Sequence, residues 1–290
     1  MTFKTNLPAA SCPALSGFSL LAFQGRDAAA FLQAQTMNDA IALSPGQWQW
    51  NGWLTPKGRV IALFALLRVA PERFWAVLPD FPAAQLQPLL QRYVFRSQLR
   101  MAADPGVVVA TGPLLATPAP ALAVGTTETG FALDCSGQGG SRSLHLLPVG
   151  HPALAASHPE QDQSWLAADL AHGLPRLPAS QREAWTPHML SLDRLSAYSL
   201  RKGCYPGQEI VARTHYLGQA KRGLVRLAGS GLQPGLPVQS GGKPVGSLVC
   251  VLPDGSEGLA VLASEPGDTL TAAGGDVRRL ELLPGLTRPA

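Results

Sequence analysis

Residues 201–213 read Arg-Lys-Gly-Cys-Tyr-Pro-Gly-Gln-Glu-Ile-Val-Ala-Arg, and no other stretch of the chain combines so many chemically distinct groups. A cation, a glycine, a thiol and a phenol precede the Pro-Gly pair, and an amide and a carboxylate follow it. Two local structures fit. Residues 205–208 can form a turn, because proline presets φ and glycine supplies a positive φ. Alternatively, Pro206 stands in the first turn of a helix that runs to about Thr214.

We favour the helix, because it places Glu209 in the first turn, where the helix dipole stabilises an anion, and makes Gly218 a suitable stop. Cys204 then lies just before a helix N-terminus, with Lys202 two residues away. Positive charge of either origin favours the thiolate form of a cysteine. We therefore predict that Cys204 is a reactive thiol. The alternative is that Cys204 is a small buried hydrophobic residue.

The same stretch resembles the signature of the YgfZ family, on the pattern Lys202-Gly203-Cys204-Tyr205-x-Gly207-Gln208-Glu209. These are folate-binding proteins of iron–sulfur cluster assembly and repair, similar in fold to the aminomethyltransferase (T-protein) of the glycine cleavage system. The resemblance implies tetrahydrofolate or a derivative as cofactor and Cys204 as the reactive group, tuned by Lys202. The residues that it implies at the folate site are Lys202, Gly203, Tyr205, Gln208, Glu209, Arg213, Asn38 and Lys57.

Two segments near the N-terminus extend the resemblance. A Gly-x-Asp turn at residues 25–27 leads to a Phe-Leu-Gln helix that ends in Asn38-Asp39, and residues 56–59 form a Pro-Lys-Gly-Arg turn. Asn38 either contacts the ligand or only caps the helix and forms a turn. Lys57 either faces an anionic ligand or is a solvent-exposed cation at a hairpin tip.

The chain departs from the family at several positions, and its Thr186-Pro187-His188 matches the family's Pro-Gln segment imperfectly. Met37 replaces a threonine, Ser191 stands where asparagine is common, and Ala171 occupies the position of a carboxylate that recognises the pterin ring in the T-protein relatives. Residues 171–175, Ala-His-Gly-Leu-Pro, resemble the family's Glu-Ala-Gly-x-Pro segment in their glycine and proline. These departures bear on how a pterin ring would be recognised, and they leave the signature itself intact.

Composition narrows the class of protein. The chain has 290 residues, 46% of them hydrophobic and 14% charged, with a net charge of +4. Such a chain builds sizeable cores, and its mild charge suits an anionic ligand but lacks the dense basic stripe of a nucleic-acid binder. The four cysteines form no Cys-x-x-Cys pair, so no metal site is predicted. Without a signal peptide or a long apolar run, the sequence predicts a cytoplasmic protein that does not enter a membrane.

Apolar patterning predicts a mixture of short strands and helices. Residues 60–69 are almost continuously apolar, which is typical of a strand covered on both faces. The chain beyond Pro284 is predicted to be a loose tail. The predicted strands are 18–23, 47–54, 59–69, 74–78, 107–110, 144–147, 224–227, 245–249 and 258–262, and the predicted helices are 28–35, 83–93 and 165–171.

These elements predict an α+β fold, and the turn-rich C-terminal segment predicts a small β-barrel. The resemblance adds three subdomains arranged as a cloverleaf around a central channel. The approximate units are 1–50 with 107–220 as a discontinuous folate-binding core, 51–106 as an α+β subdomain, and 221–290 as the barrel.

Our leading hypothesis, implied by the resemblance, is a tetrahydrofolate-binding protein that supports assembly or repair of iron–sulfur clusters in client enzymes, including tRNA-modifying ones. Its partners would be those enzymes or cluster-assembly proteins, without direct contact to nucleic acid. The alternative is a folate-dependent aminomethyl or one-carbon transferase. That reaction requires a base beside the folate, and Asp80, which we interpret as a turn residue, is the candidate. A thiol-dependent hydrolase has no supporting motif.

Overall fold

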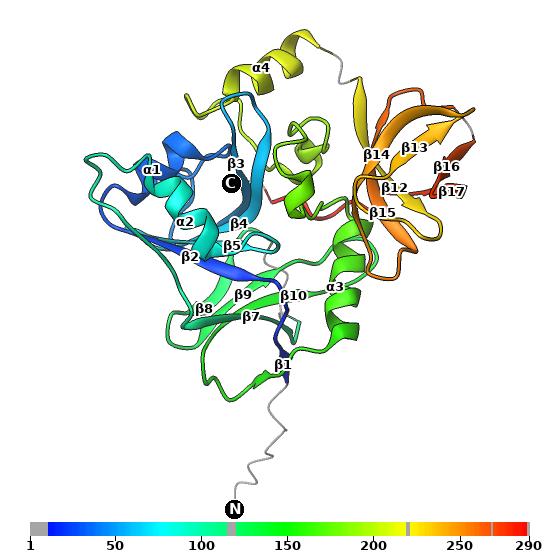
Figure 1. Ribbon diagram of the computed structural model, residues 1–290. Coiled ribbons are helices and arrows are strands. Elements are labelled where there is room, and N and C mark those ends of the chain that lie inside the picture. Colours follow the sequence, from blue (N-terminus) through cyan, green and yellow to red (C-terminus); the bar gives the residue numbers. More distant parts are fainter. Residues whose placement is uncertain (1–10, 115–119, 219–220, 268, 289–290) are drawn as a thin grey trace, which may run out of the picture.

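The computed structural model describes residues 11–114, 120–218, 221–267 and 269–288. Its strands form a five-stranded sheet, a four-stranded sheet, a two-stranded sheet and a closed barrel of six strands. Figure 1 shows the five-stranded sheet, the four-stranded sheet and the barrel as three parts of one molecule. The α+β class and the C-terminal β-barrel predicted from the sequence are confirmed.

The first part is the five-stranded antiparallel sheet with two helices on one face. In sheet order its strands are β3 (Trp48–Leu54), β4 (Val60–Ala70), β5 (Arg73–Leu78), β2 (Ser19–Gln24) and β6 (Arg100–Ala103), and its helices are α1 (Ala28–Gln35) and α2 (Ala83–Gln91). Alternate residues of β4 enter two different hydrophobic clusters, one of which contains Leu32 of α1 and Leu86 of α2. This explains the continuous apolar run, because β4 is buried on both faces.

The second part is the four-stranded sheet with α3 (Pro159–Ala171) beside it. In order its strands are β7 (Val107–Gly112), β10 (Ser143–Pro148), β9 (Gly130–Asp134) and β8 (Ala123–Thr126), and β1 (Cys12–Pro13) pairs in parallel with β11 (Leu154–Ala155). Helix α3 begins six residues earlier than the predicted start at 165. Pro159 at its first position, followed by acidic residues in the first turn, explains this start.

An irregular segment then leads to the barrel. It contains the short 3-10 helices η1 (Ala179–Gln181) and η2 (Leu192–Leu195) and the helix α4 (Gln208–Leu217). In order around the barrel, the strands are β12 (Arg222–Ala228), β15 (Glu257–Ala263), β14 (Lys243–Val251), β13 (Pro237–Ser240), β16 (Leu270–Ala272) and β17 (Gly275–Leu280). The barrel has its own core, which contains Leu227, Val238 and Leu262.

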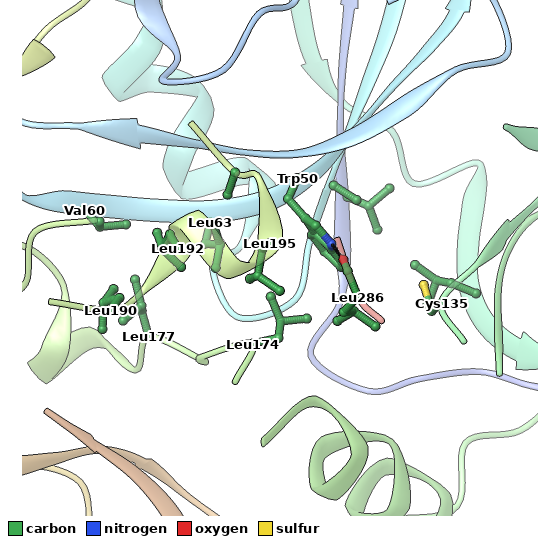
Figure 2. Packing of buried hydrophobic residues seen from close by; sticks show 14 of the residues in the cluster. Trp50, Val60, Leu63, Cys135, Leu174, Leu177, Leu190, Leu192, Leu195 and Leu286 are labelled. Atoms are coloured by element: carbon green, nitrogen blue, oxygen red, sulfur yellow. Dashed lines mark hydrogen bonds between the residues drawn. The ribbon is translucent and has the colours of Figure 1, made fainter. Parts of the chain in front are cut away.

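The chain after the barrel returns to the centre of the molecule, so the predicted loose tail is wrong. Leu286 is 2% exposed and belongs to the largest core, together with Trp50 of the first sheet. The Trp50 Nε1 donates a hydrogen bond to the Leu286 carbonyl at 2.8 Å, and Figure 2 shows the two side chains in contact with the same cluster. Arg288, 1% exposed, donates to the carbonyl oxygen of Asp134 through Nε and through a terminal nitrogen.

The largest core connects the three parts. It contains Trp50 from the first sheet, Leu146 from the second and Val261 from the barrel. Strand β3 crosses residue 50, so the first sheet draws residues from both of the first two predicted units. The barrel strands end at Leu280, and residues 281–288 pack elsewhere. The division into three units itself stays a prediction.

Candidate functional site

Residues 205–208 of the signature form a turn that precedes the helix. Our preferred interpretation, which placed Pro206 in the first turn of that helix, is therefore wrong. Gly207 has φ +80° and ψ 0°, and the Gln208 N–H donates to the Tyr205 carbonyl at 3.1 Å. These are the features of a type II turn with proline at its second position. A left-handed residue cannot continue a right-handed helix, so α4 begins at Gln208 instead of Pro206. The predicted stop is confirmed, because α4 ends at Leu217 with Gly218 as its cap.

The turn packs against the tip of the β3–β4 hairpin. A Cβ atom at Gly207 would lie 2.6 Å from both the Gly58 Cα and the Thr55 carbonyl oxygen. Two turns that are about 150 residues apart in the sequence therefore meet backbone to backbone, as only glycine permits. This contact places the exposed Lys57 on the tip beside the start of α4.

Replacement of Gly207 by alanine is expected to destabilise the protein by about 3 kcal/mol, because left-handed strain adds to a backbone clash. Thermal unfolding measures this loss. Gly203, which also has a positive φ of +92° but open space around it, is the matched control. Its alanine variant should lose only the strain, about 1–2 kcal/mol. Equal losses in the two variants would show that the contact with the hairpin tip contributes nothing.

Lys202 joins the signature to the end of α1. Its side chain is buried, and its Nζ donates to the Thr36 carbonyl at 2.5 Å and to the Gln33 carbonyl. In return, the Gln33 Nε2 donates to the Lys202 carbonyl at 2.8 Å. The ammonium also lies 4.8 Å from the centre of the Tyr205 ring. The last carbonyls of a helix lack partners within the helix, so a buried cation here satisfies them.

Burial lowers the pKa of Lys202 to about 8, and the nearby Asp39 opposes that shift. Because its hydrogen atoms are donated to α1, Lys202 holds the signature loop in place. An effect of Lys202 on the Cys204 thiol stays a prediction.

Cys204 is exposed, so the alternative of a buried hydrophobic residue is wrong for this position. The other three cysteines are buried. Burial raises the pKa of Cys135 to about 11 and that of Cys250 to about 12, which suppresses their thiolate forms at neutral pH. Cys204 is therefore the cysteine that a dissolved reagent or partner reaches.

The remaining signature residues divide into buried and exposed ones. Tyr205 is buried, and burial raises its pKa. Gln208 is half-buried as the first residue of α4. Glu209 lies in the first turn of α4, as predicted, and is exposed, as is Arg213 on the same helix.

Asn38 is buried and fully engaged with the protein. Its Nδ2 donates to the Trp50 carbonyl at 2.9 Å and to the Ser196 carbonyl at 2.7 Å, and its Oδ1 accepts from the Asp39 N–H at 3.0 Å. These bonds tie the chain after α1 to β3 and to the end of η2. The cap residue of α1 is Thr36 rather than Asn38.

A groove of about 670 Å³ lies beside the first residues of the signature. We call it the signature groove. From the predicted site residues it takes Asn38. Asp39 and Arg201 were noted only as parts of sequence motifs, and the sequence did not single out the other lining residues. The sequence could have indicated these residues only through their position, because several of them directly precede the signature or lie at the end of α4. The groove is lined by Asn38, Asp39, Ala42, Asp193, Ser196, Tyr198, Ser199, Leu200, Arg201, His215 and Tyr216.

Asp80 lies away from the signature groove, at the edge of a mostly apolar pocket of about 440 Å³ that also has Phe18, Trp165 and Arg176 in its wall. Asp80 is more than a turn residue, because its carboxylate accepts a hydrogen bond from the Leu177 N–H. Burial raises the pKa of Asp80 to about 6, although Arg176 opposes the shift.

This raised pKa predicts a pH dependence of stability. The folded state holds the Asp80 proton more tightly than the unfolded state, so the contribution is complete below pH 4 and is lost as pH rises through about 6. Replacement by asparagine keeps an acceptor for the Leu177 N–H. On going from about pH 8 to about pH 5, wild type should gain on the order of 1 kcal/mol relative to the variant. Parallel stability curves over this range would contradict the prediction.

The position of the family's pterin-binding carboxylate has no acidic substitute nearby. Ala171 is buried at the end of α3. Asp169 is ion-paired on both oxygens, at 2.7 Å to Arg142 and 2.5 Å to Arg176. The Asp169 carboxylate is therefore neutralised by two arginines and is not an unpaired charge in a cavity.

Neither a group of metal-binding side chains nor a helix able to cross a membrane occurs in residues 11–114, 120–218, 221–267 and 269–288. In those ranges, no three histidine, cysteine or acidic side chains are grouped so that they could hold a metal ion. Among the helices described, none is both long and apolar enough to cross a membrane.

Comparisons with known proteins agree with the signature. No family model matches the chain. A tRNA-modifying protein YgfZ of Vibrio vulnificus is 29% identical over 244 residues, which cover 80% of this chain and 74% of that protein. The YgfZ protein of Yersinia pseudotuberculosis is 29% identical over 233 residues, covering 74% and 70%. An uncharacterised protein of Haemophilus influenzae is 28% identical over 212 residues, covering 72% and 70%.

Among solved structures, the aminomethyltransferase of the glycine cleavage system from Bartonella henselae superposes with a TM-score of 0.74. The match covers 97% of this chain and 87% of that one at 17% identity, so it identifies the fold alone. The predicted resemblance is thereby confirmed: the chain is similar in sequence to the YgfZ proteins and has the fold of the glycine cleavage aminomethyltransferase.

Proposed function

We propose that this protein binds a tetrahydrofolate in the signature groove and supports assembly or repair of iron–sulfur clusters in client enzymes, including enzymes that modify tRNA. The observation that carries the proposal is the position of the groove. It lies between Asn38, just after α1, and Arg201, directly before the signature, and the exposed Cys204 follows three residues later. The similarity to proteins called tRNA-modifying supports the class of client.

The groove suits a folate in size and chemistry. Its volume of about 670 Å³ is within the usual range of small-molecule sites. Tyr198 and Tyr216 offer flat faces for the pterin and benzoyl rings, and Arg201 offers a bidentate partner for a carboxylate. Cys204 would act on the client or on cluster sulfur at the surface, where a partner protein has access to it.

In this proposal the three parts form a cloverleaf, and the folate lies at the rim of their meeting point. The middle is occupied by side chains such as those of Trp50 and Leu286, beside a cavity of about 20 Å³ that Trp50 and Trp165 border. A folate is too large for such a space, so the rim is the better site.

Equilibrium binding of 5-formyltetrahydrofolate, followed by calorimetry, tests the proposal. Lys202 and Tyr205 are unsuitable targets, because both are buried and their replacement would disturb the fold. The exposed groove residues Arg201 and Tyr216 are better ones. Replacement of Arg201 by glutamine together with Tyr216 by alanine should weaken binding about tenfold or more. Replacement of the exposed Arg96 by glutamine, on another part of the surface, is the control and should leave binding unchanged.

If folate binds wild type and the groove variant equally well, its site lies outside the signature groove. If folate does not bind wild type, the proposal is rejected.

The second candidate function is one-carbon transfer, and the Asp80 pocket favours it. A buried carboxyl with a pKa of about 6 is suited to accept a proton near neutral pH, and Trp165 in the same wall offers a stacking face. Transfer from an aminomethyl donor to tetrahydrofolate that is present in wild type and lost in the Asp80→Asn variant would establish this alternative. The groove variant should then transfer normally.

A further inference from the structure

A separate pocket of about 410 Å³ lies between the barrel and the segment that contains η2. We call it the histidine pocket, after His188 and His215 in its wall. Neither the signature thiol nor Asp80 lines it. It shares Asp193, Tyr198 and His215 with the signature groove, so the two depressions adjoin.

His188 is the least satisfied group in this pocket. Both of its ring nitrogens are buried, and neither has a hydrogen-bond partner. The ring lies 5.3 Å from that of Tyr198 and 6.2 Å from that of His215, measured between centres. A buried polar group without a partner destabilises the protein, and a ligand that supplies the missing hydrogen bond removes that cost. Burial lowers the pKa of His188, His215 acts in the same direction, and Asp193 opposes both.

The charged side chains around His188 indicate which kind of ligand the pocket would bind. Arg222 of β12 and Arg279 of β17 line the pocket with exposed side chains, and no ion pair engages either of them within the described residues. Asp193 is the one acidic residue among those lining the pocket. Two arginines against one carboxylate give a net positive wall, which attracts an anion.

We propose that the histidine pocket binds an oxyanion group, a carboxylate or a phosphate, of a small ligand. Arg222 and Arg279 hold the charge, and His188 donates a hydrogen bond from a ring nitrogen. The apolar remainder of the ligand lies against Leu224 and Leu262, which complete the wall. The anion also stabilises protonated His188 against its burial, so binding takes up a proton. This proposal is independent of whether folate binds in the signature groove.

Histidine Cε1–H signals in NMR spectra test the proposal on the full chain. The signal that is missing in the His188→Gln variant assigns His188. Inorganic phosphate and, separately, glutarate should shift this signal saturably and raise the pKa of His188. The double variant Arg222→Gln/Arg279→Gln should weaken phosphate binding about tenfold. Arg278→Gln, which removes an exposed arginine adjacent to Arg279 but outside the pocket lining, is the matched control and should bind as wild type.

An equal shift with sodium chloride at the same ionic strength, or unchanged phosphate binding in the double variant, would overturn the proposal. A further arm identifies the source of the oxyanion. If 5-formyltetrahydrofolate displaces phosphate from His188, the group belongs to the folate. If both bind together, it belongs to a separate phosphorylated or carboxylated ligand. Failure of folate to bind anywhere would reject the proposed function and leave the phosphate result intact.

Discussion

Replacement of Arg288 by alanine is expected to destabilise the protein by about 3 kcal/mol, because its buried guanidinium makes several charged hydrogen bonds to main-chain carbonyl groups. The guanidinium donates to the Asp134 carbonyl at 2.6 and 3.1 Å and to the Ser136 carbonyl at 3.1 Å. It also lies 5.4 Å from the centre of the Trp48 ring. Removal leaves a space in the core and takes away these charged hydrogen bonds.

Thermal unfolding should show a lower melting temperature, by roughly 6–12 °C for a chain of this size. Arg278→Ala is the control, because Arg278 is exposed on β17, and its melting temperature should stay within about 1 °C of wild type. Lysine at position 288 restores the charge but not the planar fork, so it should recover only part of the loss. A melting temperature unchanged in Arg288→Ala would mean that the C-terminal residues do not hold the core.

Replacement of Cys204 by serine should leave stability within about 0.5 kcal/mol of wild type, because the side chain is exposed. Function should change far more. The activity of cluster-dependent enzymes in cells that rely on this protein should fall about tenfold or more, since a hydroxyl is a much weaker nucleophile than a thiolate. Cys250→Ser is the contrasting variant. It buries a hydroxyl in the core, so it should lose stability.

Alkylation of the folded protein provides an independent readout. Iodoacetamide should modify Cys204 and leave the three buried cysteines intact until the protein unfolds. Wild-type cluster-enzyme activity in the Cys204→Ser variant, with normal protein levels, would show that the thiol is dispensable.

The sequence alone determined the class of fold and the position of the signature. Turn residues between short apolar runs indicated the barrel, and an uninterrupted apolar stretch identified β4 as a strand buried on both faces. These features are local, because turn chemistry and side-chain periodicity act over a few residues. The resemblance added the family for the same reason, since its signature is one contiguous stretch.

Tertiary structure decided what the signature residues do. A lysine two residues before a cysteine suggested a thiol with a lowered pKa. The Lys202 ammonium instead donates its hydrogen bonds to carbonyl groups at the end of α1, about 170 residues away. Gly207 read as the second residue of a helix, and its contact with Gly58 was invisible in the sequence. The charged, proline-containing C-terminal residues read as a loose tail, yet Leu286 and Arg288 are buried in the main core.

In each case the deciding partner lies more than a hundred residues away in the chain. Periodicity and propensity report which residues prefer to be buried and which turns are allowed, but not which distant carbonyl a buried cation will meet. That choice follows from the packing of the three parts against the largest core, where most buried donors and acceptors find a partner.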